Sequence, residues 1–406
     1  MRETGVALIM AGGRGKRMDI LSYLRPKPAL PFAGGFRVID FSLSNCIHSQ
    51  INDIAILTDY QRSSMANYLR QWNSANIPLK ELDILEPENG SYKGNADAVY
   101  QNLHYLETRG SDTVLILAGD HVYKMDYRKM IAFHHMVKAD ATVGVVRVPI
   151  EETFRFGTVT LDADKRIKEF QEKSSRSQSN LVSMGIYVFN KDLLARRLGE
   201  DAREPGSPHD FGYAILPRMV KRDRVFAYEF NRYWQDIGTI EAYYEANMEL
   251  LVSQPRYSLD SNWPIFSASS ILPVRRTSKD GNIVNSLISP GCVIEGRVKN
   301  SILSPGVYVA ERATVKNSVV MSDVSIGYHS VVDGCILDER VNIGKLCYIG
   351  FGTGILPGNR GKTVVGRDVT VPDCTAIGCK SRVEPGLEPA AFGAQLVPSG
   401  TSLVHP

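Results

Sequence analysis

Residues 283–344 carry a short repeat that restricts the possible folds of the C-terminal third of the chain. Apolar residues recur there about every six positions, with one slip: Leu303, Val309, Val315, Met321, Ile326 and Val332. The tripeptides SPG, SIG and NIG punctuate the repeat. This spacing is typical of a parallel β-helix of hexapeptide repeats, in which each coil stacks on the previous one. A β-sandwich with regularly spaced turns is the alternative.

The repeat also indicates how the chain divides. The sequence VVGRDVTVPDCTAIGCKSRVEPG, residues 364–386, resumes the same rhythm, whereas residues 251–282 contain three prolines and no clear period. We therefore predict a first domain over residues 1–250, a connection over 251–282, and a β-helix domain over 283–406.

The first 250 residues alternate short apolar runs with segments of helical period. The runs GVALIMAG, INDIAILTDY, TVLILAGD, ATVGVVRV and SMGIYVF are expected strands, and residues 61–72 and 126–138 are expected helices. Short apolar strands separated by helices predict an α/β domain with a mostly parallel sheet covered on both faces. Ligands of such sheets bind at the carboxyl ends of the strands.

Two polar stretches follow expected strands and would meet at that edge. The first, GGRGKR, contains Gly12, Gly13, Arg14, Gly15, Lys16 and Arg17, and Lys27 follows between two prolines. It matches neither the P-loop nor the GxGxxG spacing, but exposed amides with flanking cations can bind a triphosphate. A plain surface turn is the alternative.

The second stretch, LAGDHVY, places Asp120 just past an apolar strand, and Asp236 in YWQDIGT offers another carboxylate. Carboxylates at strand ends are suitable ligands for Mg²⁺, although an N-cap or turn aspartate would look the same. Glu172 and Lys173 in EFQEKS, with Ser183 and Gly185 in SMGIYVF, follow later strands. Taken alone, Lys173 would be an ordinary solvated lysine.

Composition excludes several classes of protein. The chain is 43% hydrophobic and 22% charged, and its net charge of +3 is too small to indicate nucleic acid or a membrane surface as a partner. No run reaches the ~18 apolar residues of a membrane span, and the first expected strand begins too early for a signal peptide. The six cysteines lack metal-site spacing, so we expect reduced thiols and a cytoplasmic location.

Seven ordered blocks together resemble the glucose-1-phosphate adenylyltransferase (ADP-glucose pyrophosphorylase) family. They run from about residue 5 to 345 and read ALIMAGGRGKRM with RPKPALPF, FRVIDFSLSNCI, GNADAVYQN, LILAGDHVYKMDY, SMGIYVF, HDFGYAILP and YWQDIGTIEAYYEANMELL. The resemblance implies a Rossmann-like nucleotidyltransferase domain followed by a left-handed parallel β-helix, usually in a homotetramer. It also implies synthesis of ADP-glucose from ATP and glucose 1-phosphate for glycogen or starch, with Mg²⁺ as cofactor and metabolites as allosteric effectors.

The resemblance assigns roles to individual residues. Arg14 and Lys27 would stabilise the triphosphate held by the loop from Gly12 to Arg17, and Asp120 and Asp236 would hold Mg²⁺. The remaining assignments are Tyr92, Gly94 and Asp97 for the nucleotide, and Glu172, Lys173, Ser183 and Gly185, with Asp236, for the sugar phosphate. The chemistry agrees, because a phosphate oxygen is already a nucleophile and the task is to position two polyanions.

Two positions depart from the family. Asp19 stands where relatives often carry an activator-binding lysine, so we predict weak or altered activation by fructose phosphates. EKS replaces the usual EKP after Glu172, which leaves the shape of the sugar pocket open. The cluster Arg275, Arg276 and Lys279 is a candidate effector site, with a solvated basic loop as the alternative.

Three other functions stay open at this point. A non-catalytic regulatory subunit is disfavoured because Arg14, Lys27, Asp120, Lys173 and Asp236 are all retained. A relative that uses another nucleotide or hexosamine 1-phosphate is the second. A hexapeptide-repeat acyltransferase would need a catalytic histidine, for which His329 is the candidate inside the repeat.

Overall fold

The computed structural model describes residues 5–75, 77–79, 82–88, 90–175, 177–259, 262–268, 274–276, 282–352 and 361–405. The chain forms two compact units. The first unit consists of residues 1–13, 39–234 and 262–266, and the second of residues 14–38, 235–261 and 267–406. Residues 14–38, here called the 14–38 segment, therefore belong to the same unit as the C-terminal repeat.

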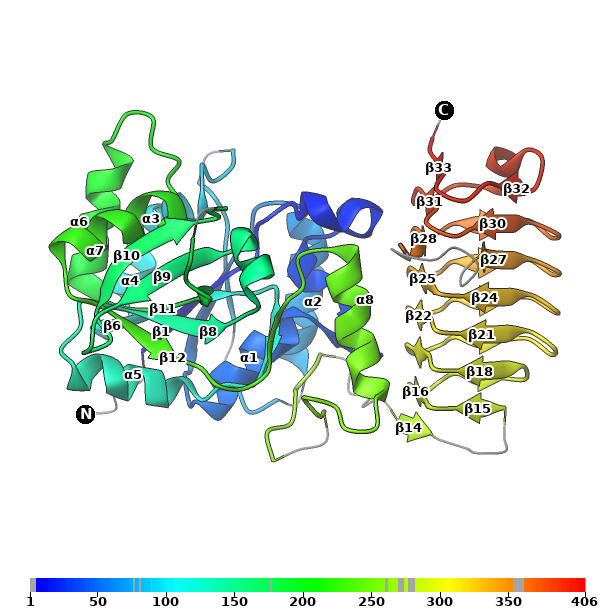
Figure 1. The fold of residues 1–406 in the computed structure, drawn as a ribbon, viewed down its shortest axis with the longest axis horizontal. Helices are drawn as coiled ribbons and strands as arrows, with labels where there is room; N and C mark the ends of the chain where they lie inside the picture. Colours follow the sequence, from blue (N-terminus) through cyan, green and yellow to red (C-terminus); the bar gives the residue numbers. More distant parts are fainter. Residues whose placement is uncertain are drawn as a thin grey trace. The chain divides into compact units, whose positions relative to one another are not determined.

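The first unit is built on one sheet, which has nine strands among the residues described (Figure 1). Its main path runs β10-β9-β11-β6-β1-β4-β5, and β8 pairs with both β11 and β12. The strands are β1 (Val6–Met10), β4 (Asp53–Leu57), β5 (Asp83–Leu85), β6 (Thr113–Ala118), β8 (Ala141–Arg147), β9 (Gly157–Leu161), β10 (Ile167–Glu172), β11 (Leu181–Asn190) and β12 (Val225–Glu229).

The direction of the strands confirms the predicted α/β fold. β5, β4, β1 and β6 are parallel neighbours, and β12 is parallel to β8. β11 runs antiparallel to β6, β8 and β9, and β10 runs antiparallel to β9. The antiparallel neighbours lie at one end of a sheet whose other end is parallel throughout.

The helices cover both faces of this sheet. Val6 and Leu8 of β1 belong to a core cluster that also contains apolar side chains of α3, α6 and α7. Ala7 and Ile9, whose side chains point to the other face, are also fully buried. The helices of this unit are α1 (Ile39–His48), α2 (Arg62–Ser74), α3 (Asn95–Gln101), α4 (Leu103–Glu107), α5 (Tyr127–Met136), α6 (Lys191–Ala202) and α7 (Leu216–Arg222).

Several shorter elements complete the first unit. They are η3 (Ile150–Arg155), the π-helical turn η4 (Phe211–Ile215) and the strand β7 (His121–Tyr123). α2 and α5 occupy the two segments for which the sequence predicts helices. Asp126 caps α5, because its carboxylate accepts a hydrogen bond from the amide of Arg128 at 3.1 Å.

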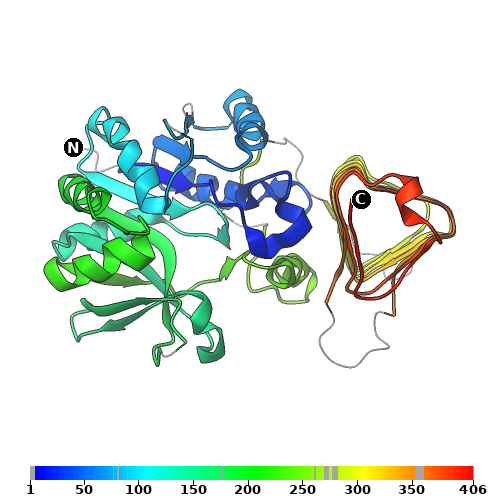
Figure 2. The same cartoon turned by 90° about the horizontal axis from the view of Figure 1, so that it is seen from above.

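The C-terminal part of the second unit is a parallel β-helix of triangular cross-section (Figure 2). One sheet contains β14 (Val274–Arg276), β16 (Ser286–Ile288), β19 (Ile302–Leu303), β22 (Val319–Val320), β25 (Cys335–Leu337), β28 (Thr363–Val365), β31 (Arg382–Val383) and β33 (Ser402–Leu403). The second contains β15 (Ile283–Val284), β18 (Arg297–Lys299), β21 (Thr314–Lys316), β24 (Val331–Asp333), β27 (Tyr348–Phe351), β30 (Ala376–Gly378) and β32 (Leu396–Val397). The third contains β17 (Val293–Ile294), β20 (Tyr308–Val309), β23 (Ser325–Ile326), β26 (Asn342–Ile343) and β29 (Thr370–Val371).

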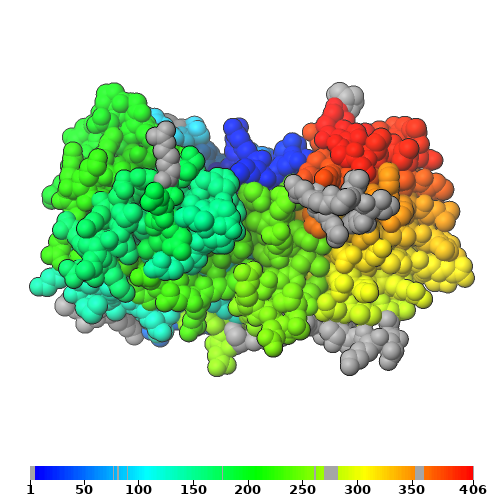
Figure 3. Space-filling model, viewed as in Figure 1, coloured from blue at the N-terminus to red at the C-terminus, as the bar shows by residue number. Residues whose placement is uncertain are grey.

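Successive coils stack in register. Leu303 pairs with Val320, Val320 with Leu337, and Leu337 with Val365, so equivalent apolar residues form a ladder inside the coil. Figure 3 shows the coils following one another in sequence order, from yellow to red. The β-helix prediction is confirmed, and the β-sandwich alternative is wrong because stacked coils pair parallel strands.

The second unit also contains the 14–38 segment and the helix α8. The segment folds into η1 (Lys16–Ser22), η2 (Lys27–Ala29) and the short strands β2 (Pro31–Phe32) and β3 (Phe36–Arg37), and α8 (Ile240–Met248) precedes η5 (Glu249–Leu251). The hydroxyl of Tyr243 in α8 donates to the carbonyl of Pro31 at 2.7 Å. Tyr244 in α8 donates to the carbonyl of Asn317 at 2.7 Å. α8 therefore contacts both the segment and the β-helix.

No helix among the residues described is both long enough and apolar enough to cross a membrane.

Candidate functional site

The carboxyl ends of β1 and β6 bring Gly12 and Asp120 to one edge of the sheet. Met10 pairs with Ala118 in register, and each site residue follows two positions later. The Asp120 carboxylate lies 3.5 Å from the Nε2 atom of His121. The expected juxtaposition of the two motifs after their strands is therefore present in the first unit.

Gly12 lies against Asp59, a residue that the sequence interpretation missed. The amide of Tyr60 donates to the carbonyl of Gly12 at 3.3 Å, and a Cβ atom at position 12 would lie 3.0 Å from that of Asp59. The Asp59 carboxylate accepts a hydrogen bond from the amide of Tyr92 at 3.2 Å. Asp59 thus connects the glycine loop to the predicted nucleotide block.

The predicted nucleotide block, Tyr92 to Asp97, is fixed by hydrogen bonds on both sides of Gly94. The Asp97 carboxylate accepts a hydrogen bond from the backbone amide of Lys93 at 2.8 Å, and the side-chain amide of Asn102 donates to the hydroxyl of Tyr92 at 3.0 Å. A Cβ atom at Gly94 would lie 2.3 Å from the carbonyl oxygen of His209, so only glycine permits this approach.

His209 and its neighbour belong to the motif HDFGYAILP, which carried no residue role in the sequence interpretation. The carbonyl of His209 accepts from the amide of Ala96 at 2.9 Å, and Asn95 accepts from the amide of Phe211 at 2.7 Å. The motifs GNADAVYQN and HDFGYAILP, which are separate in the sequence, thus pack against each other. Their joint presence in the sequence was the available signal for this contact.

The predicted sugar-phosphate residues cluster around the end of β10 and the middle of β11. Lys173 and Glu172 form an ion pair of 3.0 Å, and the Lys173 ammonium lies 5.4 Å from the ring centre of Tyr213. Ser183 accepts a hydrogen bond from the amide of Gly185 at 3.2 Å. β11 shifts register against β8 between residues 183 and 187, and the resulting bulge turns this short stretch away from regular pairing.

Burial changes the acid–base behaviour of this pair. Burial of Glu172 raises the pKa of its carboxyl group above the usual value, and the nearby Lys173 only partly opposes that rise. Burial would lower the pKa of Lys173, but Glu172 outweighs it and raises that pKa. The raised pKa of Lys173 keeps its side chain a cation at neutral pH, next to a carboxyl group whose ionisation is disfavoured by burial.

The second unit holds the other predicted cations. Gly15 has a left-handed backbone, φ 61°, and a Cβ atom there would lie 2.5 Å from the Cγ atom of Lys27. The stem of Lys27 therefore packs directly on the glycine loop. Lys27 itself is buried, whereas Arg14 and Arg17 are exposed on the same loop.

Lys27 is paired with the predicted metal ligand of the same unit. Its ammonium lies 3.8 Å from the carboxylate of Asp236, which is at the end of β13 (Trp234–Asp236). Both side chains are nearly buried, with exposed fractions of 11% and 7%. The buried Asp236 carboxylate therefore has a nearby compensating cation, and its oxygens are ligands of the kind that a divalent cation prefers.

The structure thus brings the predicted residues together in two groups. Gly12, Gly13, Tyr92, Gly94, Asp97, Asp120, Glu172, Lys173, Ser183 and Gly185 belong to the first unit, and Arg14, Gly15, Arg17, Lys27 and Asp236 to the second. Of the candidate effector cluster, Lys279 lies outside the described residues. His329 is exposed at a turn of the β-helix, beside the ring of Tyr328.

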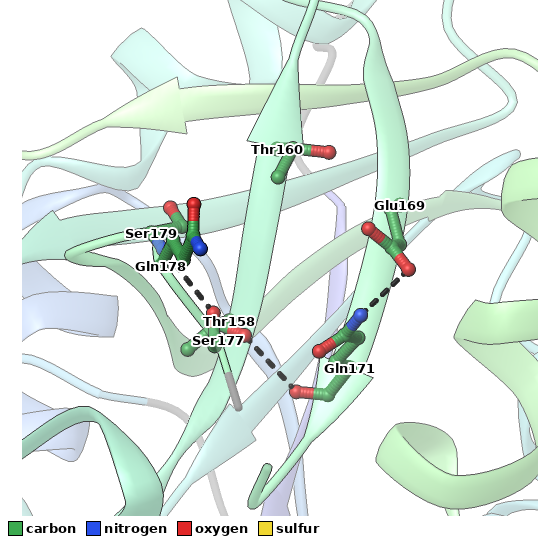
Figure 4. A pocket seen from close by; sticks show the side chains of 7 residues that line it. All are labelled: Thr158, Thr160, Glu169, Gln171, Ser177, Gln178 and Ser179. Atoms are coloured by element: carbon green, nitrogen blue, oxygen red, sulfur yellow. Dashed lines mark hydrogen bonds between the residues drawn. The ribbon is translucent and has the colours of Figure 1, made fainter. Parts of the chain in front are cut away.

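A polar hollow of about 360 Å³ on the first unit contains none of these residues (Figure 4). It lies over β9 and β10, and its lining is Thr158, Thr160, Glu169, Gln171, Ser177, Gln178 and Ser179. Adjacent side chains of a strand point to opposite faces, so Gln171 in the hollow faces away from Glu172. The hollow is separate from the sugar-phosphate residues.

Comparison with known families supports both halves of the fold. Residues 6–253 match the model of the nucleotidyl transferase family, and residues 272–354 match the model of the GlmU-like C-terminal hexapeptide family. The predicted architecture of a nucleotidyltransferase domain followed by a left-handed β-helix of hexapeptide repeats is confirmed.

The chain is also similar over almost its whole length to individual glucose-1-phosphate adenylyltransferases. It is 43% identical to that of Thermomicrobium roseum, an alignment that covers 98% of this chain and 96% of the relative. It is 40% identical to that of Acetivibrio thermocellus, covering 98% and 97%. The protein from Pseudothermotoga lettingae is 40% identical, with 98% and 99% covered.

Proposed function

The chain belongs to the glucose-1-phosphate adenylyltransferase family of nucleotidyl transferases, and from this premise we propose that it converts ATP and glucose 1-phosphate into ADP-glucose and pyrophosphate. The observation that carries the proposal is the retention of Arg14, Lys27, Asp120, Lys173 and Asp236 in a chain alignable end to end with such enzymes. A regulatory subunit without activity would have no use for this complete set.

The reaction needs no general base. An oxygen of the glucose 1-phosphate attacks the α-phosphorus of ATP, and the bond from that phosphorus to the bridging oxygen of the β-phosphate breaks. Pyrophosphate departs with the electron pair. Arg14 and Lys27 act as cations beside the charge that develops on the leaving group, and Lys27 needs little reorganisation because it is already buried and packed.

Glu172, Lys173 and Ser183 bind the second substrate in this proposal. Lys173 contacts the phosphate, and Glu172 accepts hydrogen bonds from sugar hydroxyls. The ion pair between them keeps the ammonium in place before the substrate arrives. The block from Tyr92 to Asp97 holds the nucleoside part of ATP.

The nucleotidyl transferase family relies on divalent metal ions, and we propose Mg²⁺ for this chain. The donor set fits, because Asp120 and Asp236 supply the hard carboxylate oxygens that Mg²⁺ prefers. When bound, the ion would neutralise phosphate charge and orient the α-phosphate.

Further proposals follow from family membership. We propose a cytoplasmic homotetramer that serves the synthesis of α-glucan storage polymers and responds to metabolite effectors, with domain limits at residues 250 and 283.

The decisive experiment measures pyrophosphate release with Mg²⁺, crossing four nucleoside triphosphates with glucose 1-phosphate and glucosamine 1-phosphate. We expect release with ATP and glucose 1-phosphate, and its loss in Asp120→Asn. Release with a different pair would assign another nucleotidyltransferase specificity. A folded protein that is silent with every pair would favour the regulatory subunit.

A further inference from the structure

A buried cluster of charged side chains joins the 14–38 segment to the β-helix within the second unit. Arg25 donates to the carboxylate of Glu339 at 2.9 Å and also contacts Asp338. Arg37 donates to the other oxygen of Glu339 at 3.2 Å, and Arg367 contacts Glu339 as well. All three arginines thus contact the side chain of Glu339, and the group is called here the Glu339 hub.

The centre of the hub is closed to solvent. The exposed fraction is 2% for Arg25, 2% for Asp338 and 7% for Glu339. Burial would raise the pKa of Glu339, but the three arginines outweigh it and hold that pKa below its usual range. Glu339 is therefore ionised at neutral pH, and removing its charge would leave the buried Arg25 with Asp338 as its remaining carboxylate partner in the hub.

The two hub arginines that belong to the 14–38 segment, Arg25 and Arg37, bracket Lys27. Arg25 precedes it by two residues, with Pro26 between them and Pro28 after it, so the backbone at this point has few accessible conformations. Arg37 also donates a hydrogen bond to the carbonyl of Ala29 at the end of η2. The hub consequently fixes both sides of the short turn that carries Lys27.

A second contact fixes the glycine loop to the β-helix. Asp19, which follows the loop, pairs with Arg382 of β31 at 3.1 Å. Asp19 has a left-handed backbone angle, φ 51°, a conformation that persists only when surrounding contacts hold it. The position of the cationic loop is therefore set by ion pairs to the β-helix at two places.

We propose that Glu339 is a positioning residue for the triphosphate of ATP. By holding Arg25 and Arg37, the β-helix fixes the turn on which Lys27 lies and the loop packed against it. The inference rests on the proposed function, since it takes Arg14 and Lys27 as the triphosphate cations. In this inference the β-helix contributes to the ATP site indirectly, because the Glu339 carboxylate holds the turn that carries Lys27 and touches no substrate itself.

The test compares the two substrates in one variant. Glu339→Gln keeps the shape of the side chain and removes its charge. We expect KM for ATP and the ATP dissociation constant, measured by calorimetry without the sugar phosphate, to rise about tenfold, because small displacements of positioned groups are costly. KM for glucose 1-phosphate should stay within about twofold, because Glu172, Lys173 and Ser183 are not held by the hub.

Three further variants separate positioning from general damage. Glu339→Asp keeps the charge and should restore part of the ATP affinity. Arg37→Gln, at a partly exposed member of the hub, should show the same ATP-selective defect even if Glu339→Gln does not fold. Glu311→Gln removes an exposed ion pair with Arg312 on the same β-helix and should change neither constant. Thermal unfolding of each variant sets the assay temperature below its midpoint.

The outcomes distinguish the inference from the proposed function. Folded hub variants with unchanged ATP binding, or with both substrates weakened equally, would overturn the inference. A wild-type protein that binds ATP without releasing pyrophosphate would overturn the proposed function, and the calorimetric comparison would still decide the role of Glu339.

Discussion

Lys27 and Lys173, the two lysines assigned to phosphate groups, are held in different ways. Lys27 is nearly buried, packs on Gly15, and lies on a turn fixed by the Glu339 hub. Lys173 has a side chain that is 47% exposed, and a single adjacent carboxylate, Glu172, pairs with it. Tertiary contacts therefore hold the region around Lys27, here called the rigid region, whereas a local ion pair with Glu172 holds Lys173 in what is here called the exposed region.

The difference matches the two tasks in the proposed reaction. A cation that stabilises the departing pyrophosphate acts best when it cannot move, because fixed charges need no reorganisation as the transition state forms. A cation that captures an incoming sugar phosphate gains from access to solvent, because the ligand must reach it. Both regions use lysine, but burial suits one to catalysis and exposure suits the other to binding.

The largest effect is expected at Asp120, the proposed metal ligand, because the metal serves the reaction of both substrates. Asp120→Asn should lower kcat about 10³-fold, because a neutral amide binds a divalent cation far less well than a carboxylate. Initial rates over a range of Mg²⁺ concentrations measure the loss. Activity restored fully by excess Mg²⁺ would show a weaker role in metal binding, and activity near the wild-type value would contradict the assignment.

The next variant probes the rigid region. Lys27→Gln should lower kcat by about 10²-fold or more, the scale seen when one fixed electrostatic group is removed from a transition-state site. Lys27→Arg should remain impaired, because the longer side chain must fit the space against Gly15. Steady-state kinetics with both substrates separate this loss from a change in KM. A change confined to KM for glucose 1-phosphate would reverse the assignment.

The matched variant probes the exposed region. Lys173→Gln should raise KM for glucose 1-phosphate by about 10- to 100-fold while kcat changes less, because the lysine contributes binding in ground state and transition state alike. The measurement is the same kinetic analysis at saturating ATP. A kcat loss as large as that of Lys27→Gln would remove the distinction between the two regions.

Stability should separate the regions as well. Arg25→Met leaves buried carboxylates without their partner and should cost about 3–5 kcal/mol in the free energy of unfolding, whereas Lys173→Met should cost less than about 1 kcal/mol. Denaturant unfolding followed by circular dichroism measures both. Equal values would show that the hub adds no more stability than the surface pair.

The smallest effects concern pH. The lowered pKa of Glu339 means that its contribution to stability is present above the unfolded value, about 4.3, and is lost as pH falls through the still lower folded value. The raised pKa of Glu172 means that its protonation begins at higher pH. As pH falls, KM for glucose 1-phosphate should therefore rise before stability declines. Glu172→Gln is the control, and it should lose that part of the pH dependence.

Much of the fold could be predicted from the sequence. The β-helix follows from the six-residue spacing of residues such as Val309 and Val315, because each coil must bury the same positions. Five strands of the first unit, β1, β4, β6, β8 and β11, were predictable from apolar runs. Parallel pairing of β1 with β6 then predicts that Gly12 and Asp120 lie at the same edge of the sheet. These features depend on local patterns, so no knowledge of distant contacts was needed.

Other parts depend on contacts between distant residues. The Asp59 carboxylate and the His209 carbonyl support the nucleotide block by accepting hydrogen bonds from backbone amides that lie 33 and more than 100 positions away in the chain. Arg25 and Glu339 are separated by 314 positions, and nothing in the neighbourhood of either marks them as partners. Charged residues are usually solvated, so only their burial in the folded chain reveals a shared site.

The sequence by itself thus determined which chemical groups we propose for the binding of a nucleotide and a sugar phosphate, because those groups lie in short motifs. Tertiary structure alone decided how firmly each group is held. It placed Lys27 in a buried turn tied to the β-helix and left Lys173 near solvent, because burial and ion pairing are set by residues that meet only after the chain has folded.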